Sequence, residues 1–128
     1  MYGSSDEKSD LGGHDNRHAG NLLLFVGQGF GVGPVVAGHA DEYSNNTVVL
    51  AHDGEVGGGN CGAAGPTRAL VERNVYITPT GKAQECGMSL AAWQAADKQH
   101  NDVGSVARAY PPDLDTAAVD WARQLLGL

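Results

Sequence analysis

Three short segments in which an asparagine precedes a run of apolar residues restrict the possible folds of this chain more than any other feature. They begin at Asn21, Asn46 and Asn74, which are 25 and 28 residues apart. A Gly-His pair also recurs, because His14 and His39 each lie seven residues before one of these asparagines. A period in the twenties with short β-branched segments predicts a parallel β-solenoid, in which each coil carries one copy of the segment.

The same repeat predicts how polar side chains meet in successive coils. Coils of a solenoid stack about 4.8 Å apart, and an amide side chain both donates and accepts hydrogen bonds. We therefore expect the three asparagines to form a structural ladder; the alternative is that they are ordinary turn residues at strand starts. A 25-residue register also places His39 over His14 and Asp41 over Asn16.

The glycine-rich run LLLFVGQGFGVGPVV, residues 22–36, raises the alternative of a phosphate-binding loop. A dinucleotide fingerprint fails, because Gly29 and Gly31 are followed by Pro34 where a third glycine is needed. A P-loop also fails, because no lysine lies between Lys8 and Lys82. The run therefore predicts a strand over 22–26, a glycine turn, and a second strand over 31–36.

The pattern changes after residue 86. Ser89 can cap a short helix that carries Leu90 and Trp93 on one side, and residues 115–128 predict a second helix. We expect β-solenoid coils over 1–88 and a helical capping segment over 89–128. A helix laid over the last strand would protect its unpaired edge, whereas the N-terminal coil has no such cover.

Composition and charge exclude several classes of protein. The formal net charge of −7 argues against binding to nucleic acid or to an anionic membrane, and no apolar run is long enough to span a membrane. The first ten residues lack the apolar core of a signal peptide. Cys61 and Cys86 are expected either to form one disulfide or to remain an unlinked pair.

Several of these segments together resemble a known family. They are ERNVYITPTG at 72–81, ECGMSLAAWQA at 85–95 and DVGSV at 102–106, and their order is similar to the C-terminal part of right-handed parallel β-helix proteins of the pectin-lyase-like type. The resemblance implies an all-β fold, a right-handed parallel β-helix of a few coils with one or two C-terminal helices as a cap. Such relatives are usually longer, so we expect further coils to precede this portion.

The resemblance also implies a location outside the cell or on its surface. Many such proteins bind or cleave polysaccharides along a groove on the coil surface, and in that setting the disulfide is the favoured state of the two cysteines. Two functions are therefore expected: a polysaccharide-active enzyme of lyase or hydrolase type, or a non-catalytic glycan-binding or surface module. Fold alone does not choose between them.

The densest group of reactive side chains lies at residues 6–18, and the register brings residues 39–41 beside it. Elimination from a uronate needs a base and a cation that stabilises the developing charge, whereas hydrolysis needs two carboxylates. The catalytic candidates are His14, Asp15, Arg17 and His39. The candidates for substrate contact are Lys8, His18 and Asp41, and those for a Ca²⁺ site are Asp10, Asp15 and Asp41. The alternative is that these residues only stabilise solenoid turns.

The acidic balance limits the substrate and the partners. A neutral glycan, or an anionic one bridged by Ca²⁺, is compatible with a chain of charge −7. Because the N-terminal coil is expected to end in an open strand edge, self-association through that coil is a further expectation.

Overall fold

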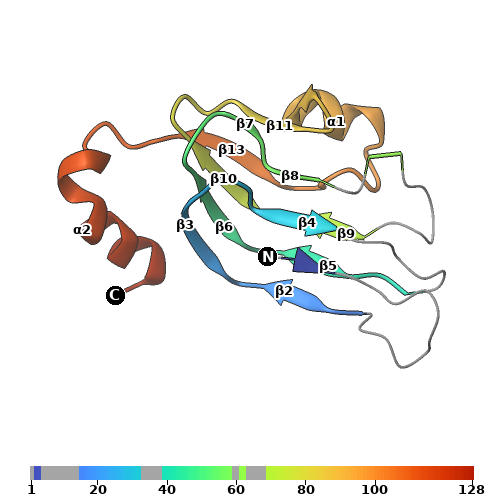
Figure 1. Ribbon diagram of the computed structural model, residues 1–128, viewed down its shortest axis with the longest axis horizontal. Coiled ribbons are helices and arrows are strands. Elements are labelled where there is room, and N and C mark those ends of the chain that lie inside the picture. The colour runs from blue at the N-terminus through green and yellow to red at the C-terminus, as the bar shows by residue number, and fades with distance from the viewer. Residues whose placement is uncertain (1, 4–14, 33–38, 59–60, 63–68) are drawn as a thin grey trace.

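The computed structural model describes residues 2–3, 15–32, 39–58, 61–62 and 69–128. Within these residues the chain is predominantly β, with parallel strands in stacked sheets (Figure 1). The early strands are β1 (Tyr2–Gly3), β2 (Arg17–Ala19), β3 (Leu22–Val26), β4 (Phe30–Val32), β5 (Glu42–Ser44), β6 (Thr47–Leu50), β7 (Gly54–Glu55) and β8 (Gly57–Gly58). The later elements are β9 (Leu70–Glu72), β10 (Val75–Thr78), β11 (Ala83–Glu85), β12 (Met88–Ser89), α1 (Leu90–Ala96), β13 (Val106–Ala109) and α2 (Leu114–Leu126).

Each sheet takes one strand from each successive stretch of the chain. The largest sheet has the order β13-β10-β6-β3, and the others have the orders β2-β5-β9, β1-β4-β8 and β12-β11-β7. All pairings of neighbouring strands are parallel except that of β11 with β12. The chain therefore passes from one sheet to the next and then returns to the first sheet, where its new strand pairs in parallel with the earlier one. This arrangement is consistent with a β-helix-like fold.

The strand register reproduces the repeat that the sequence indicates. Thr47 pairs with Leu22 on one side and with Val75 on the other, and Val75 pairs with Val106 of β13. The segments that follow the three asparagines therefore lie side by side in the same direction.

The core fills the space between the sheets. The side chains of Tyr43, Val48 and Tyr76 are almost completely buried, because alternate residues of each strand point inward. Gly57 leaves room for the ring of Phe30, since a Cβ at that position would lie 2.2 Å from the ring. These rows of buried side chains make one continuous cluster along the stack.

The C-terminal part closes one end of this core. Helix α1 begins after Ser89, whose hydroxyl accepts a hydrogen bond from the backbone N–H of Ala92 at 3.2 Å, as expected for an N-cap. Leu90 and Trp93 are buried, and α1 lies against β11 and β12. The short helix predicted from the sequence is therefore confirmed, and its apolar side faces the core.

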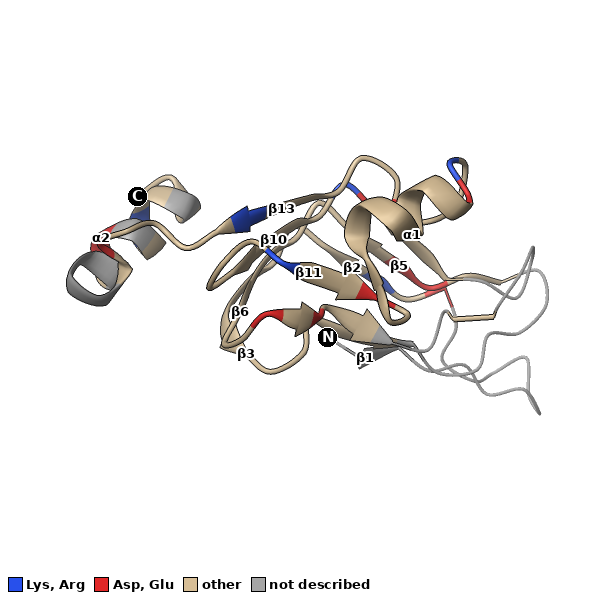
Figure 2. Cartoon of the chain, turned by 90° about the horizontal axis from the view of Figure 1, so that it is seen from above, with Lys and Arg blue, Asp and Glu red and all other residues tan. Residues whose placement is uncertain are grey.

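Two expectations about the C-terminal part need correction. The strands do not stop at residue 88, because β13 adds a parallel strand beyond β10. Helix α2 does not lie over this last strand: Figures 1 and 2 show it projecting beyond the sheets. Instead, β12 and α1 cover the β11 end of the stack. In the glycine-rich run, the predicted strand over 22–26 is confirmed as β3, whereas residues 33–36 lie outside the described residues.

Candidate functional site

The asparagine ladder fixes the positions of the turns between two of the sheets. Asn46 Oδ1 accepts from Asn21 Nδ2 at 3.0 Å, and Asn74 Oδ1 accepts from Asn46 Nδ2 at 3.0 Å. The backbone N–H groups of Asn21 and Asn46 donate to the same oxygens. Ser105 takes the fourth position, where its hydroxyl accepts from the backbone N–H of Asn74 at 2.7 Å. The chain therefore turns at the same place in four successive layers.

The residue before each ladder position has a left-handed backbone. These residues are Gly20, Asn45, Arg73 and Gly104, with φ between 52° and 73°. The conformation is rarely adopted by residues other than glycine, so Asn45 and Arg73 hold it because the ladder fixes the turn. Their exposed side chains lie near each other, with Arg73 Nε 3.4 Å from Asn45 Oδ1.

Asp41 occupies a second, shorter ladder. Its side chain is 1% exposed, and its Oδ1 accepts from the backbone N–H of Asn16 at 2.9 Å and from Asn16 Nδ2 at 3.1 Å. The expected placement of Asp41 over Asn16 is thus found. A buried carboxylate with these partners stabilises the turn, so the structure does not support the expectation that Asp41 contacts substrate or Ca²⁺.

His18 also points away from solvent. Its ring stacks on the buried ring of Tyr43, with centroids 4.9 Å apart and planes 13° from parallel. His18 pairs with Tyr43 in the register of β2 and β5, so it extends the inward-facing row of the core. The structure therefore does not support His18 as a substrate contact; strand alternation with the exposed Arg17 could have indicated this.

The candidates Asp15, Arg17 and His39 lie on the outer surface at the sheet β2-β5-β9, together with charged residues that were not candidates. We call this surface the charged face; it consists of Asp15, Arg17, His39, Glu42, Glu72 and Arg73. Arg17 Nε lies 3.1 Å from Glu42 Oε2, and Arg73 forms an ion pair with its neighbour Glu72. Figure 2 shows basic and acidic positions of β2 and β5 next to one another.

One histidine of the charged face is held by a carboxylate. His39 Nδ1 lies 2.6 Å from Asp15 Oδ2, and Asp15 Oδ1 accepts from the backbone N–H of Ala40 at 3.0 Å. Both side chains are partly open to solvent. The contact orients the imidazole and leaves its Nε2 directed away from the carboxylate, which is the arrangement that a general base needs.

The carboxylate at the centre of this face is held in its ionised form. The Ser44 hydroxyl donates a hydrogen bond to Glu42, and this bond is the main cause that lowers the pKa of Glu42; the positive charge of Arg17 adds to it. Glu42 is therefore an acceptor at neutral pH. The Ser44 hydroxyl and the Arg17 guanidinium both contact the Glu42 carboxylate, so the three side chains hold one another in place by hydrogen bonds.

Three predicted site residues, Lys8, Asp10 and His14, lie outside the described residues. Among the residues that the structure does describe, no group of three or more His, Cys, Asp or Glu side chains is placed to hold a metal ion. The proposed Ca²⁺ site thus has only Asp15 as a described, exposed ligand, and it stays a prediction.

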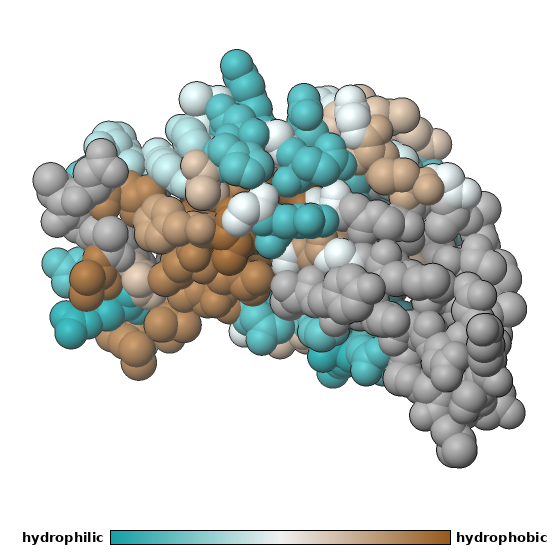
Figure 3. Space-filling model, viewed as in Figure 1, coloured by the Kyte–Doolittle hydropathy of each residue, from teal (hydrophilic) through white to brown (hydrophobic). Residues whose placement is uncertain are grey.

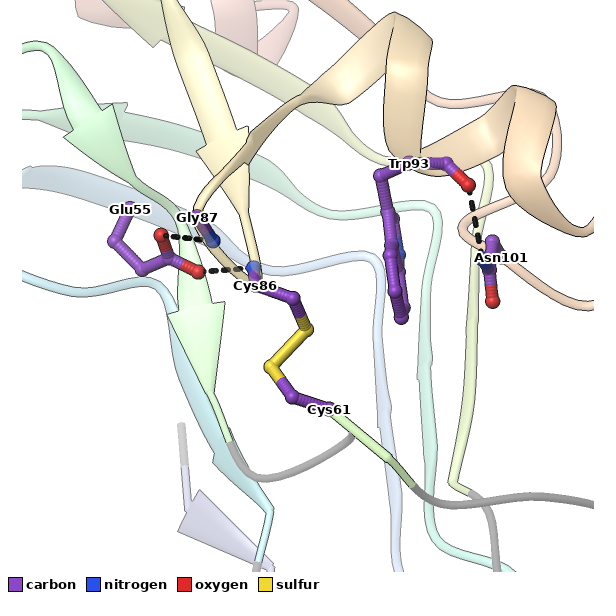
Figure 4. Close-up of a disulfide and its surroundings, with 6 residues drawn as sticks. All are labelled: Glu55, Cys61, Cys86, Gly87, Trp93 and Asn101. Carbon is purple, nitrogen blue, oxygen red and sulfur yellow. Dashed lines mark hydrogen bonds between the residues drawn. A yellow bond between two sulfur atoms is a disulfide. The ribbon is translucent and has the colours of Figure 1, made fainter.

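The two cysteines form a disulfide, which was the favoured alternative of the sequence analysis (Figure 4). Their Cα atoms are 5.5 Å apart, and the bridge closes a loop between positions 25 residues apart. Beside it, the Glu55 carboxylate accepts from the backbone N–H groups of Cys86 and Gly87. Bridge and carboxylate together hold the hairpin between β11 and β12 against β7.

A buried polar cluster that the sequence pattern did not predict lies below the C-terminal cap. Asp102 is 1% exposed, accepts from the Tyr76 hydroxyl at 2.8 Å and contacts the Ser105 hydroxyl. Burial raises the pKa of Asp102, and it raises that of Tyr76 still more clearly. The cluster joins segment 101–105 to β10 and therefore anchors the end of the stacked sheets. The one sequence signal for this cluster is the position of Ser105, which lies 31 residues after Asn74 and so continues the spacing of the ladder.

The comparisons with known proteins give no relative. No family model matches the chain, no curated protein matches it, and no solved structure matches it. Among the described residues, no helix is long and apolar enough to cross a membrane. Function must therefore be inferred from the geometry of the chain itself.

Proposed function

We propose that this chain is part of a right-handed parallel β-helix protein of the pectin-lyase-like type, located outside the cell, and that its charged face binds polysaccharide. The parallel register at intervals of 25 to 31 residues supports the fold. The disulfide supports an oxidising compartment. Sequence resemblance and the order of the sheets point to the same architecture.

The observation that carries the binding proposal is the row of paired charges on β2 and β5, Arg17 with Glu42, together with a second ion pair of Glu72 with Arg73 at the end of β9. Ion pairs such as Arg17 with Glu42 present fixed donors and acceptors on successive strands, about 4.8 Å apart. A chain of sugar rings carries hydroxyl groups that can bond to such a row. Because acidic and basic groups nearly balance on this face, a neutral glycan fits better than an unassisted polyanion.

Affinity electrophoresis against neutral and anionic glycans, with and without Ca²⁺, tests the proposal. We expect retardation by at least one glycan, reduced in Arg17→Ala and in Arg73→Ala. Arg123→Ala is the matched control, because it removes an arginine from α2, away from the charged face. If no glycan retards the protein, or if the control variant loses binding equally, the proposal is wrong.

Cleavage of the bound glycan is the second candidate function, and the contact of His39 with Asp15 favours it. In an elimination, His39 Nε2 would take the proton from the carbon beside the uronate carboxyl. The electron pair would form the double bond as the glycosidic C–O bond breaks, the leaving oxygen would take a proton from water, and Arg17 would stabilise the charge that develops on the carboxyl group.

His100 provides a matched control for this function, because it also contacts an aspartate, with Nδ1 2.9 Å from Asp97 Oδ2, but it has no contact with Asp15 or Arg17 among those that the structure describes. We expect His39→Ala to abolish release of unsaturated products from a uronate polymer, and His100→Ala to retain it. Glycan binding without any turnover in the unaltered protein would exclude cleavage and leave the binding proposal intact.

A further inference from the structure

A groove lies between helix α1 and strand β13. Its two adjoining parts have volumes of about 570 Å³ and 260 Å³, and both are lined by Gln94, Ser105 and Val106. The larger part also reaches the buried side chains of Ala83 and Leu90. Its size is in the range of small-ligand and peptide sites.

One side of the groove is the edge of a sheet. The backbone N–H of Val106 donates to Asn74 O, and that of Tyr110 donates to Thr78 O, each at 2.9 Å. In a parallel pair, alternate residues bond to the neighbouring strand, so the main-chain N–H and C=O of Ala107 point away from β10. Among the strands of the described residues, β13 is the last in its sheet.

The flanking positions of this edge already have partners. Gln94 Nε2 donates to Ser105 O at 2.9 Å and to Asp102 O at 2.8 Å, and Ala109 forms an antiparallel bridge with Thr80. The open section is therefore short and centred on Ala107. A ligand that bonds there must place an extended main chain between these two covered ends.

The charges that line the groove have one sign. Lys82 lines the larger part and Lys98 the smaller part, and no acidic residue is among the described residues that line either one. This is the reverse of the chain as a whole, whose net charge is −7. Both lysines are exposed, so they attract an anionic ligand at the two ends of an apolar floor.

We propose that this groove binds a short, extended, acidic peptide segment, which adds a strand beside Ala107. Addition of a strand to a sheet edge supplies affinity through main-chain hydrogen bonds, and pockets for alternate side chains supply selectivity. The inward side chain of the peptide enters the cavity above Leu90, while acidic groups at its ends contact Lys82 and Lys98. This function is independent of glycan binding on the charged face.

A labelled pentapeptide of sequence EVTVE, acetylated and amidated, is a suitable probe. Its central residues favour extended structure. Binding is measured by fluorescence polarisation and by amide shifts in NMR spectra of the full chain, at up to about 1 mM peptide. The charge-reversed peptide KVTVK and an oligogalacturonate of similar length are the comparisons. We expect EVTVE alone to bind, with shifts at Ala107 and Lys82.

Two variants test the mechanism. Lys82→Glu should weaken EVTVE binding about tenfold, whereas Arg123→Glu makes the same charge change on α2 and should leave binding unchanged. Ala107→Pro removes the edge N–H without removing a bond to β10 and should abolish binding; an unchanged melting curve shows that the fold is intact. The proposal is overturned if EVTVE causes no shifts, if both groove variants bind it normally, or if the oligogalacturonate binds there and EVTVE does not.

Discussion

Removing the ladder asparagines one at a time should destabilise the protein in a graded order that follows burial. In Asn74→Ala, the backbone N–H and Nδ2 of Asn46 lose their acceptor, and Tyr43 O loses its donor. All three groups belong to buried residues. A buried polar group left without a partner costs about 1–3 kcal/mol, so the loss should be about 4 kcal/mol after partial relaxation.

The other two positions should cost less. Asn46→Ala leaves His18 O without its donor, but Asn74 Oδ1 keeps the backbone N–H of residue 46. The backbone N–H and Nδ2 of Asn21 also lose their acceptor, but Asn21 is exposed, so water can replace it. The expected loss is therefore about 2 kcal/mol. Asn21 is exposed at the end of the ladder, where water replaces its contact, so Asn21→Ala should cost at most about 1 kcal/mol.

Urea unfolding followed by far-ultraviolet circular dichroism, with the disulfide intact, measures these free energies of unfolding. Asn45→Gly is the control: it changes the exposed residue beside the ladder, keeps the left-handed backbone accessible, and should stay within about 0.5 kcal/mol of the unaltered protein. Equal losses at the three ladder positions, or the largest loss at Asn21, would refute the reasoning.

Three further changes have expected outcomes. Reduction of the Cys61–Cys86 bridge should lower the free energy of unfolding by about 3 kcal/mol, because it frees a loop spanning 25 residues. Urea unfolding with and without reductant measures this loss, and an unchanged urea midpoint would contradict the prediction. Burial raises the pKa of Asp102 above its usual value of 3.8, so the free energy of unfolding should fall as pH rises from 3.8 through the raised pKa. Asp102→Asn should remove this dependence in urea unfolding measured across pH. An unaltered pH profile in the variant would show that Asp102 is not its source. Self-association through the N-terminal end should appear in light scattering as a mass that grows with concentration, because Leu24 is exposed on β3, the strand that ends its sheet among the described residues. Figure 3 shows an apolar area on this side of the molecule. Leu24→Lys should prevent the association, and a monomer at every concentration would count against it.

The sequence predicted the parts of the fold that repeat. The register of Asn21, Asn46 and Asn74 is visible because each repeat must place its turn over the previous one. The fourth layer was missed, because Ser105 replaces asparagine there and β13, of sequence VARA, lacks the run of large apolar residues found in the other three segments. A repeat that changes its polar residue is recognisable only from the spacing.

The charged face was only partly predictable. The register brought His39 near residues 14–16, and the contact with Asp15 follows from it. The inward positions of His18 and Asp41 depend on which face of a short strand or turn is buried. A strand of three residues is too short for the alternation of apolar and polar residues to show which face that is. The groove beside β13 depends on where α1 packs, which no local pattern states.

The central claim is that successive segments lie parallel in the register of the ladder, and proton–proton contacts in NMR spectra test it most directly. The account predicts contacts between Val48 and Tyr76 and between Tyr76 and Ala107, because these residues are paired across neighbouring strands. Contacts of Thr47 with Thr78 in place of Val75 would mean that the segments run antiparallel, and they would contradict the account.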